Sequence, residues 1–234
     1  MAHDPYSYGS QFGVGGRITP GVRALLIANV GVFALQVVAQ MAGGAGIEPI
    51  FGLNPTKVFE SGWAWQLVTY MFLHSTDWLG HLLLNMLMFW MFGTEIERRW
   101  GTRSFVQYYF VCGIGAGLTT CAFFYDTTTI GASGAVFGVM LAYGLTFPNR
   151  QILFWFIFPM RAISFVLLCA GIEMFSLLGL RDGIAHWAHL GGMLFGYLYI
   201  KRAWRIREFW RELRWKLRRR RFRVLRDDEH YPFH

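Results

Sequence analysis

Six apolar runs divide this sequence, and they constrain its fold more than any other feature. A helix needs about 20 mostly apolar residues to cross a bilayer, and each run comes close to that length. Backbone groups that meet no water must be hydrogen-bonded within the segment, which favours helices in such runs. The sequence therefore predicts an all-α membrane protein, a bundle of six transmembrane helices at residues 24–42, 78–93, 104–124, 132–147, 162–179 and 184–200.

The composition agrees with a membrane protein. Hydrophobic residues make up 54% of the chain and charged residues only 15%, which is too few for an ordinary soluble domain. Cys112, Cys121 and Cys169 all lie inside apolar runs, so we interpret them as packing residues rather than disulfide partners. Residues 1–19 are polar and glycine-rich, and we expect no cleavable signal segment there.

The basic residues predict an orientation. Short loops rich in Lys and Arg stay in the cytoplasm. Placing both termini there leaves only Lys57 and Arg181 on the outside. We therefore expect a multi-pass protein of a bacterial inner (plasma) membrane with both termini cytoplasmic, and with these basic residues inside together with the tail: Arg17, Arg23, Arg98, Arg99, Arg103, Arg150 and Arg161.

More than half of the 22 Lys and Arg residues lie in the tail, between residues 201 and 226. Apolar side chains recur there at helical spacing, with arginines between them, which is typical of a helix on an anionic membrane surface. Nucleic-acid binding by the run 218–221 is the alternative, and we favour lipid because the membrane is the nearer surface. The apolar positions are Ile206, Phe209, Trp210, Leu213 and Leu217.

We expect three parts: a polar N-terminal segment (1–20), a membrane domain (21–200) and a basic cytoplasmic tail (201–234). The connection at 43–77 is long and carries aromatic residues, which favours short amphipathic pieces in the outer interface over a plain solvated loop. Residues 151–160 are apolar, but a crossing there would bury Arg161, so we place them at the inner interface.

Polar residues inside three of the runs are the functional candidates, because such groups are costly in a membrane and usually face the bundle interior. His81 and Asn85 lie four residues apart and share a helix face. Ser133 begins the fourth run, and His189 lies near the start of the sixth. The proposed orientation brings all four to the same depth.

This set suits acyl transfer. A serine hydroxyl becomes a good nucleophile when a histidine accepts its proton, which predicts Ser133 and His189 as the catalytic pair. The oxyanion needs donors, which the Ser133 backbone N–H, His81 and Asn85 could supply. The positive end of a helix beginning at Ser133 would help.

Glycines favour the close approach that this pair requires. Small residues let two membrane helices pack tightly. We expect the glycines of the fourth run to face those of the sixth, namely Gly131, Gly134 and Gly138 against Gly192 and Gly196.

Several of these motifs together resemble the rhomboid intramembrane serine proteases, over residues 24–200. The resemblance rests on Gly131-Ala132-Ser133-Gly134, on Ala188-His189-Leu190-Gly191-Gly192 with Gly196, on His81 with Asn85, and on Gly93-Thr94-Glu95-Ile96-Glu97.

The resemblance implies a protease that cleaves transmembrane helices of single- or multi-span membrane proteins near the outer membrane face, without a cofactor or metal. Ser133 would be the nucleophile and His189 the base. His81 and Asn85 would stabilise the oxyanion, and Phe137 would stack on the base. Glu97 would steady the inner ends of the second and third spans.

Other readings of the polar residues remain open. His186 is interpreted as a rim or packing residue. Glu173 is an intramembrane carboxylate that could be functional or could be a neutral acid beside a Ser or Tyr. Zinc binding by the membrane histidines is less favoured, because Ser133 and Asn85 have no place in it. No role is assigned to His74 or Asp182.

Two other functions compete with proteolysis. A rhomboid-like protein can bind membrane proteins without cleaving them, but such proteins usually lack the Ser–His pair. A small transporter or channel would also place polar residues in the bundle, and solute flux would then survive replacement of Ser133 and His189.

Overall fold

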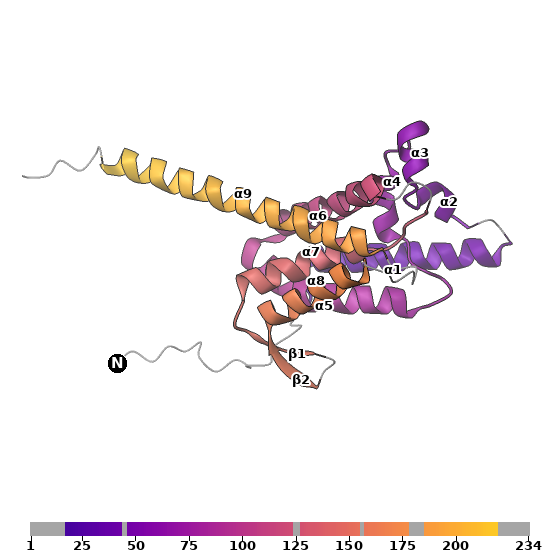
Figure 1. Ribbon diagram of the computed structural model, residues 1–234, viewed down its shortest axis with the longest axis horizontal. Coiled ribbons are helices and arrows are strands. Elements are labelled where there is room, and N and C mark those ends of the chain that lie inside the picture. Colours follow the sequence, from indigo (N-terminus) through magenta and orange to yellow (C-terminus); the bar gives the residue numbers. More distant parts are fainter. Residues whose placement is uncertain (1–16, 44–45, 124–126, 155–156, 178–184, 220–234) are drawn as a thin grey trace, which may run out of the picture. The chain divides into compact units, whose positions relative to one another are not determined.

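The computed structural model describes residues 17–43, 46–123, 127–154, 157–177 and 185–219 (Figure 1). It is mostly helical and divides into two compact units, Met1–Tyr199 and Ile200–His234. The long helices are α1 (Pro20–Met41), α5 (Gly80–Trp100), α6 (Thr102–Phe123), α7 (Ser133–Thr146), α8 (Ala162–Ser176) and α9 (His186–Arg219). The expected N-terminal segment lies largely outside the described residues.

Each of the six apolar runs falls on one of these long helices. Within the described residues, α1 and α6 are long and apolar enough to cross a membrane. The apolar helices α7 and α8 are shorter, with 14 and 15 residues. The structure thus supports a helical architecture with membrane-compatible helices, while six crossings remain a prediction.

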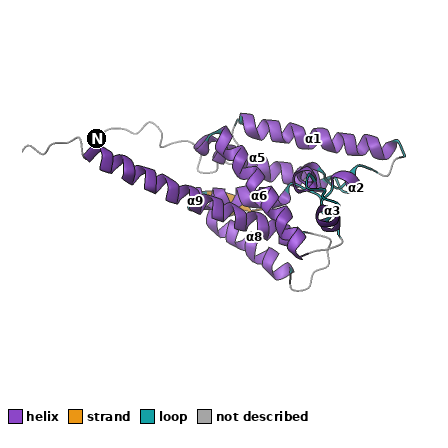
Figure 2. Ribbon diagram, turned by 90° about the horizontal axis from the view of Figure 1, so that it is seen from above, coloured by secondary structure: helices purple, strands orange, loops and turns teal. Residues whose placement is uncertain are grey.

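Helix α7 forms the centre of the first unit. It packs against α5, α6 and α8, and most of its side chains are buried, including Val139 and Tyr143. A helix that is apolar on all sides is typical of a protein core or of a membrane span. Figure 2 shows α1 and α8 on opposite sides of this bundle.

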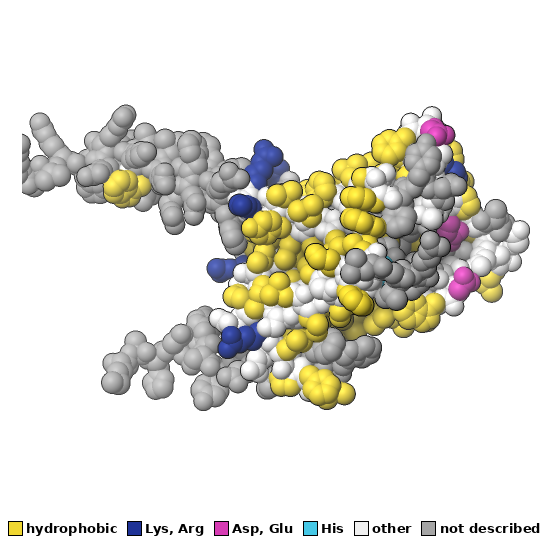
Figure 3. All heavy atoms as spheres, in the orientation of Figure 1, with side chains coloured by type: hydrophobic (Ala, Val, Ile, Leu, Met, Phe, Trp, Pro, Cys, Tyr) yellow, Lys and Arg dark blue, Asp and Glu magenta, His cyan; other side chains and the backbone are white. Residues whose placement is uncertain are grey.

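The outer helices expose large apolar side chains instead of polar ones. Figure 3 shows hydrophobic side chains spread across the visible face of the first unit. On α1, Leu35 and Val38 are each 63% exposed, and on α8 Phe175 is 71% exposed. Isolated exposed residues of this kind are ordinary, but whole apolar faces mark a surface that meets lipid or protein.

The long connection after α1 is folded. It contains α2 (Glu48–Phe51), α3 (Pro55–Glu60), α4 (Gln66–Thr69) and the 3₁₀ helix η1 (Tyr70–Phe72), so the expected short helical pieces are present. The buried Gln66 side chain accepts a hydrogen bond from Asn54 N and donates one to Ile50 O. Its position at a membrane interface stays a prediction.

A β-hairpin departs from the all-α expectation. Strands β1 (Gln151–Phe154) and β2 (Phe158–Arg161) pair antiparallel, with Gln151 opposite Arg161. The segment is apolar and short, so periodicity could not separate a strand from a helix.

Helix α9 begins at His186, in the first unit, and its later part, from Ile200 to Arg219, belongs to the second unit. The sequence predicts a helical tail, and this segment is helical. The side chains of its predicted apolar positions, Ile206 to Leu217, lie outside the described residues, so their contact with lipid stays a prediction.

Glu97 of α5 joins three helices at one end of the bundle. Its carboxylate is buried and accepts hydrogen bonds from Gly21 N (2.7 Å) and Val22 N (2.8 Å), in the first turn of α1. It also accepts hydrogen bonds from the hydroxyls of Thr19 and Thr102. The N-terminal N–H groups of α1 lack partners within their own helix, so Glu97 acts as a cap supplied by a different helix. The contact with Thr102 links α5 to α6 as the resemblance implied, and the link to α1 is an addition.

Glycines set the spacing between α7 and α9. A methyl group built on Gly192 would lie 1.9 Å from Gly134 O, and one built on Gly138 would lie 3.0 Å from Gly192 O. These backbones therefore touch, as expected for small residues. The expected glycine pairing is wrong at two positions, because Gly196 faces Tyr108 and Cys112 of α6, and Gly131 faces His81 of α5.

Glu97→Ala should lower the free energy of unfolding by about 2–4 kcal/mol, because four donors lose a charged acceptor in a buried place. Thermal unfolding in detergent measures this. Glu95→Ala on the same helix is the control, since its ion pairs with Arg98 and Arg150 are partly exposed and contribute about 0–1 kcal/mol. Equal unfolding temperatures for the two variants would contradict the capping role.

Gly192→Ala should destabilise the protein by about 1–3 kcal/mol or prevent folding, because the new methyl group meets the backbone of α7. Gly31→Ala, in α1, is the matched control: nothing lies within 4 Å of its added methyl group. That change should be neutral or stabilising by about 0.5–1 kcal/mol. Unfolding temperatures decide the matter, and a Gly192→Ala protein as stable as Gly31→Ala would show that the helices do not touch here.

Candidate functional site

Ser133 and His189 lie in hydrogen-bond contact. Ser133 Oγ is 2.7 Å from His189 Nε2. Ser133 is the first residue of α7, and His189 lies in the first turn of α9. Ser133 is half-buried and His189 is buried. The backbone contact of Gly134 with Gly192 brings the two helices close enough for this bond.

Phe137 covers one face of the His189 ring. The two rings stack with centroids 4.3 Å apart and an interplanar angle of 7°. Phe137 stands one turn after Ser133 on the same helix, so α7 supplies both the hydroxyl and the surface against which the imidazole rests. This contact restricts rotation of the ring and keeps Nε2 directed at Ser133.

His81 and Asn85 lie on the adjacent helix α5. The backbone N–H of Ser75 donates to His81 Nδ1 at 3.2 Å, so a neutral His81 carries its proton on Nε2. Asn85 is buried and donates from Nδ2 to His81 O at 2.8 Å, and an amide nitrogen has a second proton. Both side chains therefore provide donors on this face of α5.

Gly131 separates His81 from Ser133. A methyl group built on Gly131 would stand 2.8 Å from His81 Nε2 and 3.8 Å from Ser133 Oγ. The φ angle of Gly131 is +124°, which L-residues rarely adopt. Its N–H donates to Tyr70 O at 2.9 Å, so η1 holds the turn in place. A side chain at this position would therefore press on His81 Nε2 and stand beside the Ser133 hydroxyl.

His74 packs behind His81, although the sequence assigned it no role. The ring centroids are 5.1 Å apart, in an edge-on arrangement. Burial, followed by the proximity of His81, lowers the pKa of His74 to about 4. The ring is therefore neutral at physiological pH and adds no positive charge beside the site. Its backbone is fixed by Gln36, which accepts from His74 N and donates to His74 O.

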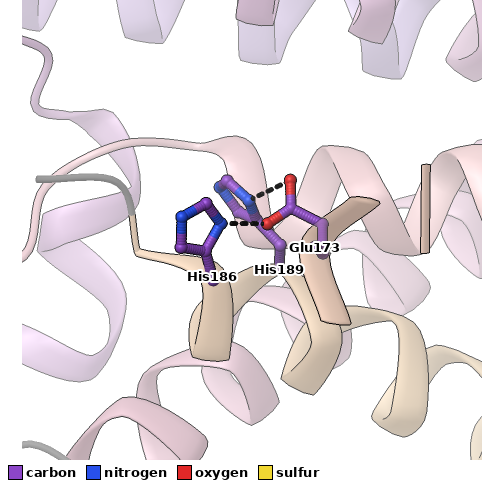
Figure 4. A group of neighbouring side chains, drawn as sticks. All are labelled: Glu173, His186 and His189. Atoms are coloured by element: carbon purple, nitrogen blue, oxygen red, sulfur yellow. Dashed lines mark hydrogen bonds and ion pairs between the residues drawn. The ribbon is translucent and has the colours of Figure 1, made fainter. Parts of the chain in front are cut away.

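Glu173 and His186 complete a buried cluster that the sequence did not assign to the site (Figure 4). Glu173 Oε2 lies 2.6 Å from His186 Nδ1, and Oε1 lies 3.0 Å from His189 Nδ1. The second contact is at ion-pair distance but falls short of hydrogen-bond alignment. Glu173 thus pairs with two histidines rather than with a Ser or Tyr. His186, interpreted from the sequence as a rim or packing residue, is a buried and hydrogen-bonded member of the cluster. The one signal in the sequence was an acidic residue within an apolar helix.

The same cluster has the composition of a metal site. Glu173, His186 and His189 offer ligand atoms within 4.8 Å of one another. Zinc accepts such a set at about 2.0–2.2 Å from each ligand atom. The alternative prediction was one zinc site made by the membrane histidines. This group holds only His186 and His189 of them, whereas His74 and His81 contact each other. Asp182, to which the sequence assigned no role, lies outside the described residues.

Comparison with known proteins gives a family assignment. Residues 61–206 match the family model described as Rhomboid domain, which is more than half of the chain. The chain is 29% identical to RHOMBOID-like protein 4 of Arabidopsis thaliana over 65% of this chain and 37% of the relative. It is 34% identical to Rhomboid-like protease 1 of Toxoplasma gondii over 63% of this chain and 50% of the relative.

A third relative, Rhomboid protein 1, mitochondrial, of Saccharomyces cerevisiae, is 33% identical over 55% of this chain and 38% of the relative. The chain spans about half, or less, of the length of these curated relatives. The matched region includes α5 to α8 and the start of α9. It therefore contains Ser133 and His189, the donors His81 and Asn85, and Glu173. This chain belongs to the rhomboid family.

Proposed function

We propose that this chain is an intramembrane serine endopeptidase that cleaves transmembrane helices of other membrane proteins near the outer membrane face. The observation that carries the proposal is the 2.7 Å contact between Ser133 Oγ and His189 Nε2, with Phe137 stacked on the imidazole. A hydroxyl hydrogen-bonded to an oriented imidazole is the arrangement that nucleophilic acyl transfer requires. The name of the Toxoplasma relative, a rhomboid-like protease, agrees with this activity.

In the proposed reaction, His189 Nε2 takes the Ser133 proton while Oγ attacks the scissile carbonyl carbon. The carbonyl oxygen becomes an oxyanion, which the Ser133 N–H, His81 Nε2–H and the Asn85 amide stabilise. The His189 imidazolium then gives its proton to the leaving amine as the C–N bond breaks. Water attacks the acyl-enzyme with His189 again as the base, which releases the carboxylate and regenerates Ser133.

Helix termini favour this chemistry. The first N–H groups of α7 have no partner within the helix, and they point toward the Ser133 end. Their partial positive charge stabilises a developing oxyanion. The half-buried position of Ser133 keeps the reaction in a partly desolvated place, where these interactions are stronger than in water.

The apolar helices and the charge pattern support a membrane setting. We propose a multi-pass protein with six spans and both termini in the cytoplasm, and with the basic tail on the anionic inner leaflet. Substrates would be single- or multi-span membrane proteins. A substrate helix must unwind locally before cleavage, because its peptide groups are already hydrogen-bonded within the helix.

Ser133→Ala should abolish cleavage of a membrane-protein reporter in proteoliposomes, because the nucleophile is lost. Labelling by a fluorophosphonate probe should disappear in the same variant. Ser164→Ala is the control, because Ser164 is exposed on α8 and outside the site. Cleavage that survives Ser133→Ala would rule out the serine mechanism, and a wild-type protein that binds reporters without cutting them would favour a non-proteolytic rhomboid-like protein.

Gly131→Ala should lower kcat by about 100-fold or more, because the methyl group would occupy the space between His81 Nε2 and Ser133 Oγ. The positive φ angle adds strain of its own. Gly101→Ala controls for that strain: its φ is +82°, and nothing lies within 4 Å of an added methyl group. Reporter cleavage by both variants, corrected for folded protein, makes the comparison. Equal kcat values would mean that the oxyanion does not form beside Gly131.

A further inference from the structure

Glu173 is a buried carboxylate that the proposed reaction does not use. It is only 8% exposed, and it stands on α8, an apolar helix. A buried charge is costly unless it is paired and hydrogen-bonded. Each of its two oxygens lies against the Nδ1 of a histidine near the start of α9 (Figure 4). Among the described residues, His186 and His189 therefore compensate the burial of this carboxylate.

The tautomer of His189 links this carboxylate to the serine. To accept the Ser133 proton, Nε2 must be unprotonated, so the neutral ring carries its proton on Nδ1. Nδ1 is the atom that lies 3.0 Å from Glu173 Oε1. The contact lacks hydrogen-bond alignment here, and catalytic hydrogen bonds are often loose before substrate binds.

His186 holds the other side of the carboxylate. Its Nδ1 lies 2.6 Å from Oε2, close enough for a strong charge-assisted hydrogen bond. His186 and His189 lie three residues apart on α9, so their rings meet Glu173 from neighbouring positions of one helix. Glu173 is thus fixed by one histidine while it faces the other.

We propose that Glu173 is a positioning residue for His189, holding its proton on Nδ1 and stabilising the imidazolium that forms when Ser133 attacks. His186 fixes the orientation of the carboxylate. The site then combines three residues from three helices: Ser133 from α7, His189 from α9 and Glu173 from α8. The serine proton moves to His189 Nε2, and Glu173 stays ionised. This inference rests on the proposed protease function.

A bound metal is the competing explanation of the same cluster. Zinc would coordinate His189 Nδ1 in place of its proton, so the ring could no longer act as this general base. The 2.6 Å separation of His186 Nδ1 and Glu173 Oε2 is a hydrogen-bond distance. Two ligands held about 2.0–2.2 Å from a tetrahedral ion stand more than about 3 Å apart. The geometry therefore favours the proton-linked arrangement.

The test is steady-state cleavage of a membrane reporter in proteoliposomes by the wild type, Glu173→Gln and Glu173→Asp. Glu173→Gln keeps the size of the side chain and removes its charge. We expect kcat to fall about 10- to 100-fold with KM changed less than twofold, because only the transition state contains the imidazolium. Glu173→Asp restores the charge on a shorter side chain and should recover part of the lost kcat. Glu95→Gln, the same change at a carboxylate far along α5 from His81, should leave kcat unchanged.

His186 provides an independent arm of the experiment. His186→Ala should lower kcat less than Glu173→Gln, and adding it to Glu173→Gln should cause no further loss, because it acts through Glu173. If Glu173→Gln does not fold, as judged by thermal unfolding, Glu173→Asp carries the test alone: kcat reduced about three- to tenfold at unchanged KM supports the proposal, and wild-type kcat overturns it.

The outcomes separate this inference from the function on which it rests. Cleavage that is lost in Ser133→Ala but kept at wild-type kcat in Glu173→Gln overturns the role of Glu173 alone. A change confined to KM, or a loss that Asp does not reverse in a folded protein, also overturns it. Activation of the wild type by a chelator, absent in Glu173→Gln, would assign the cluster to a metal instead. Cleavage kept in Ser133→Ala would overturn the protease mechanism first.

Discussion

The structure depends on the contact between the backbones of α7 and α9. Gly134 and Gly192 meet with no room for a single methyl group between them. Helices in an apolar environment gain little from burying apolar side chains, so close packing and hydrogen bonds must hold them together. This contact also sets the distance at which Ser133 and His189 meet, so the packing of the bundle and the geometry of the site have one origin.

Buried polar groups provide the remaining fixed points. Glu97 ties the start of α1 to α5, and Gln36 binds the backbone of His74 in the connection that follows α1. The Tyr108 hydroxyl donates to Gly138 O at 2.7 Å, which joins α6 to α7. Each donor or acceptor has its partner on a distant element, and an unpaired group in such a place is costly. These bonds therefore specify which helices are neighbours. Apolar surfaces cannot do so, because one apolar face packs against another without a fixed partner.

Much of the fold and of the site could be predicted from the sequence. The apolar runs match the long helices, and the family motifs select Ser133 and His189, which the structure brings into contact. The hairpin at β1 and β2 could not be predicted, because a short apolar run fits a strand or a helix equally well. The predicted partners of Gly131 and Gly196 were wrong for a different reason. Helical spacing tells which residues share a face, but the neighbour of that face depends on how each helix is rotated in the bundle.

The sequence alone predicts which groups gather at the site: a hydroxyl, an imidazole and donor groups at the ends of apolar helices, in an order typical of rhomboids. The surroundings of the imidazole depend on how the helices pack. Phe137 lies one turn from Ser133, so its place could be inferred along the helix. Glu173 lies on a separate helix whose rotation no local pattern fixes, and only the packing of α8 against α7 brings its carboxylate to His186 and His189. Contacts within one helix follow from periodicity, whereas contacts between helices follow from packing.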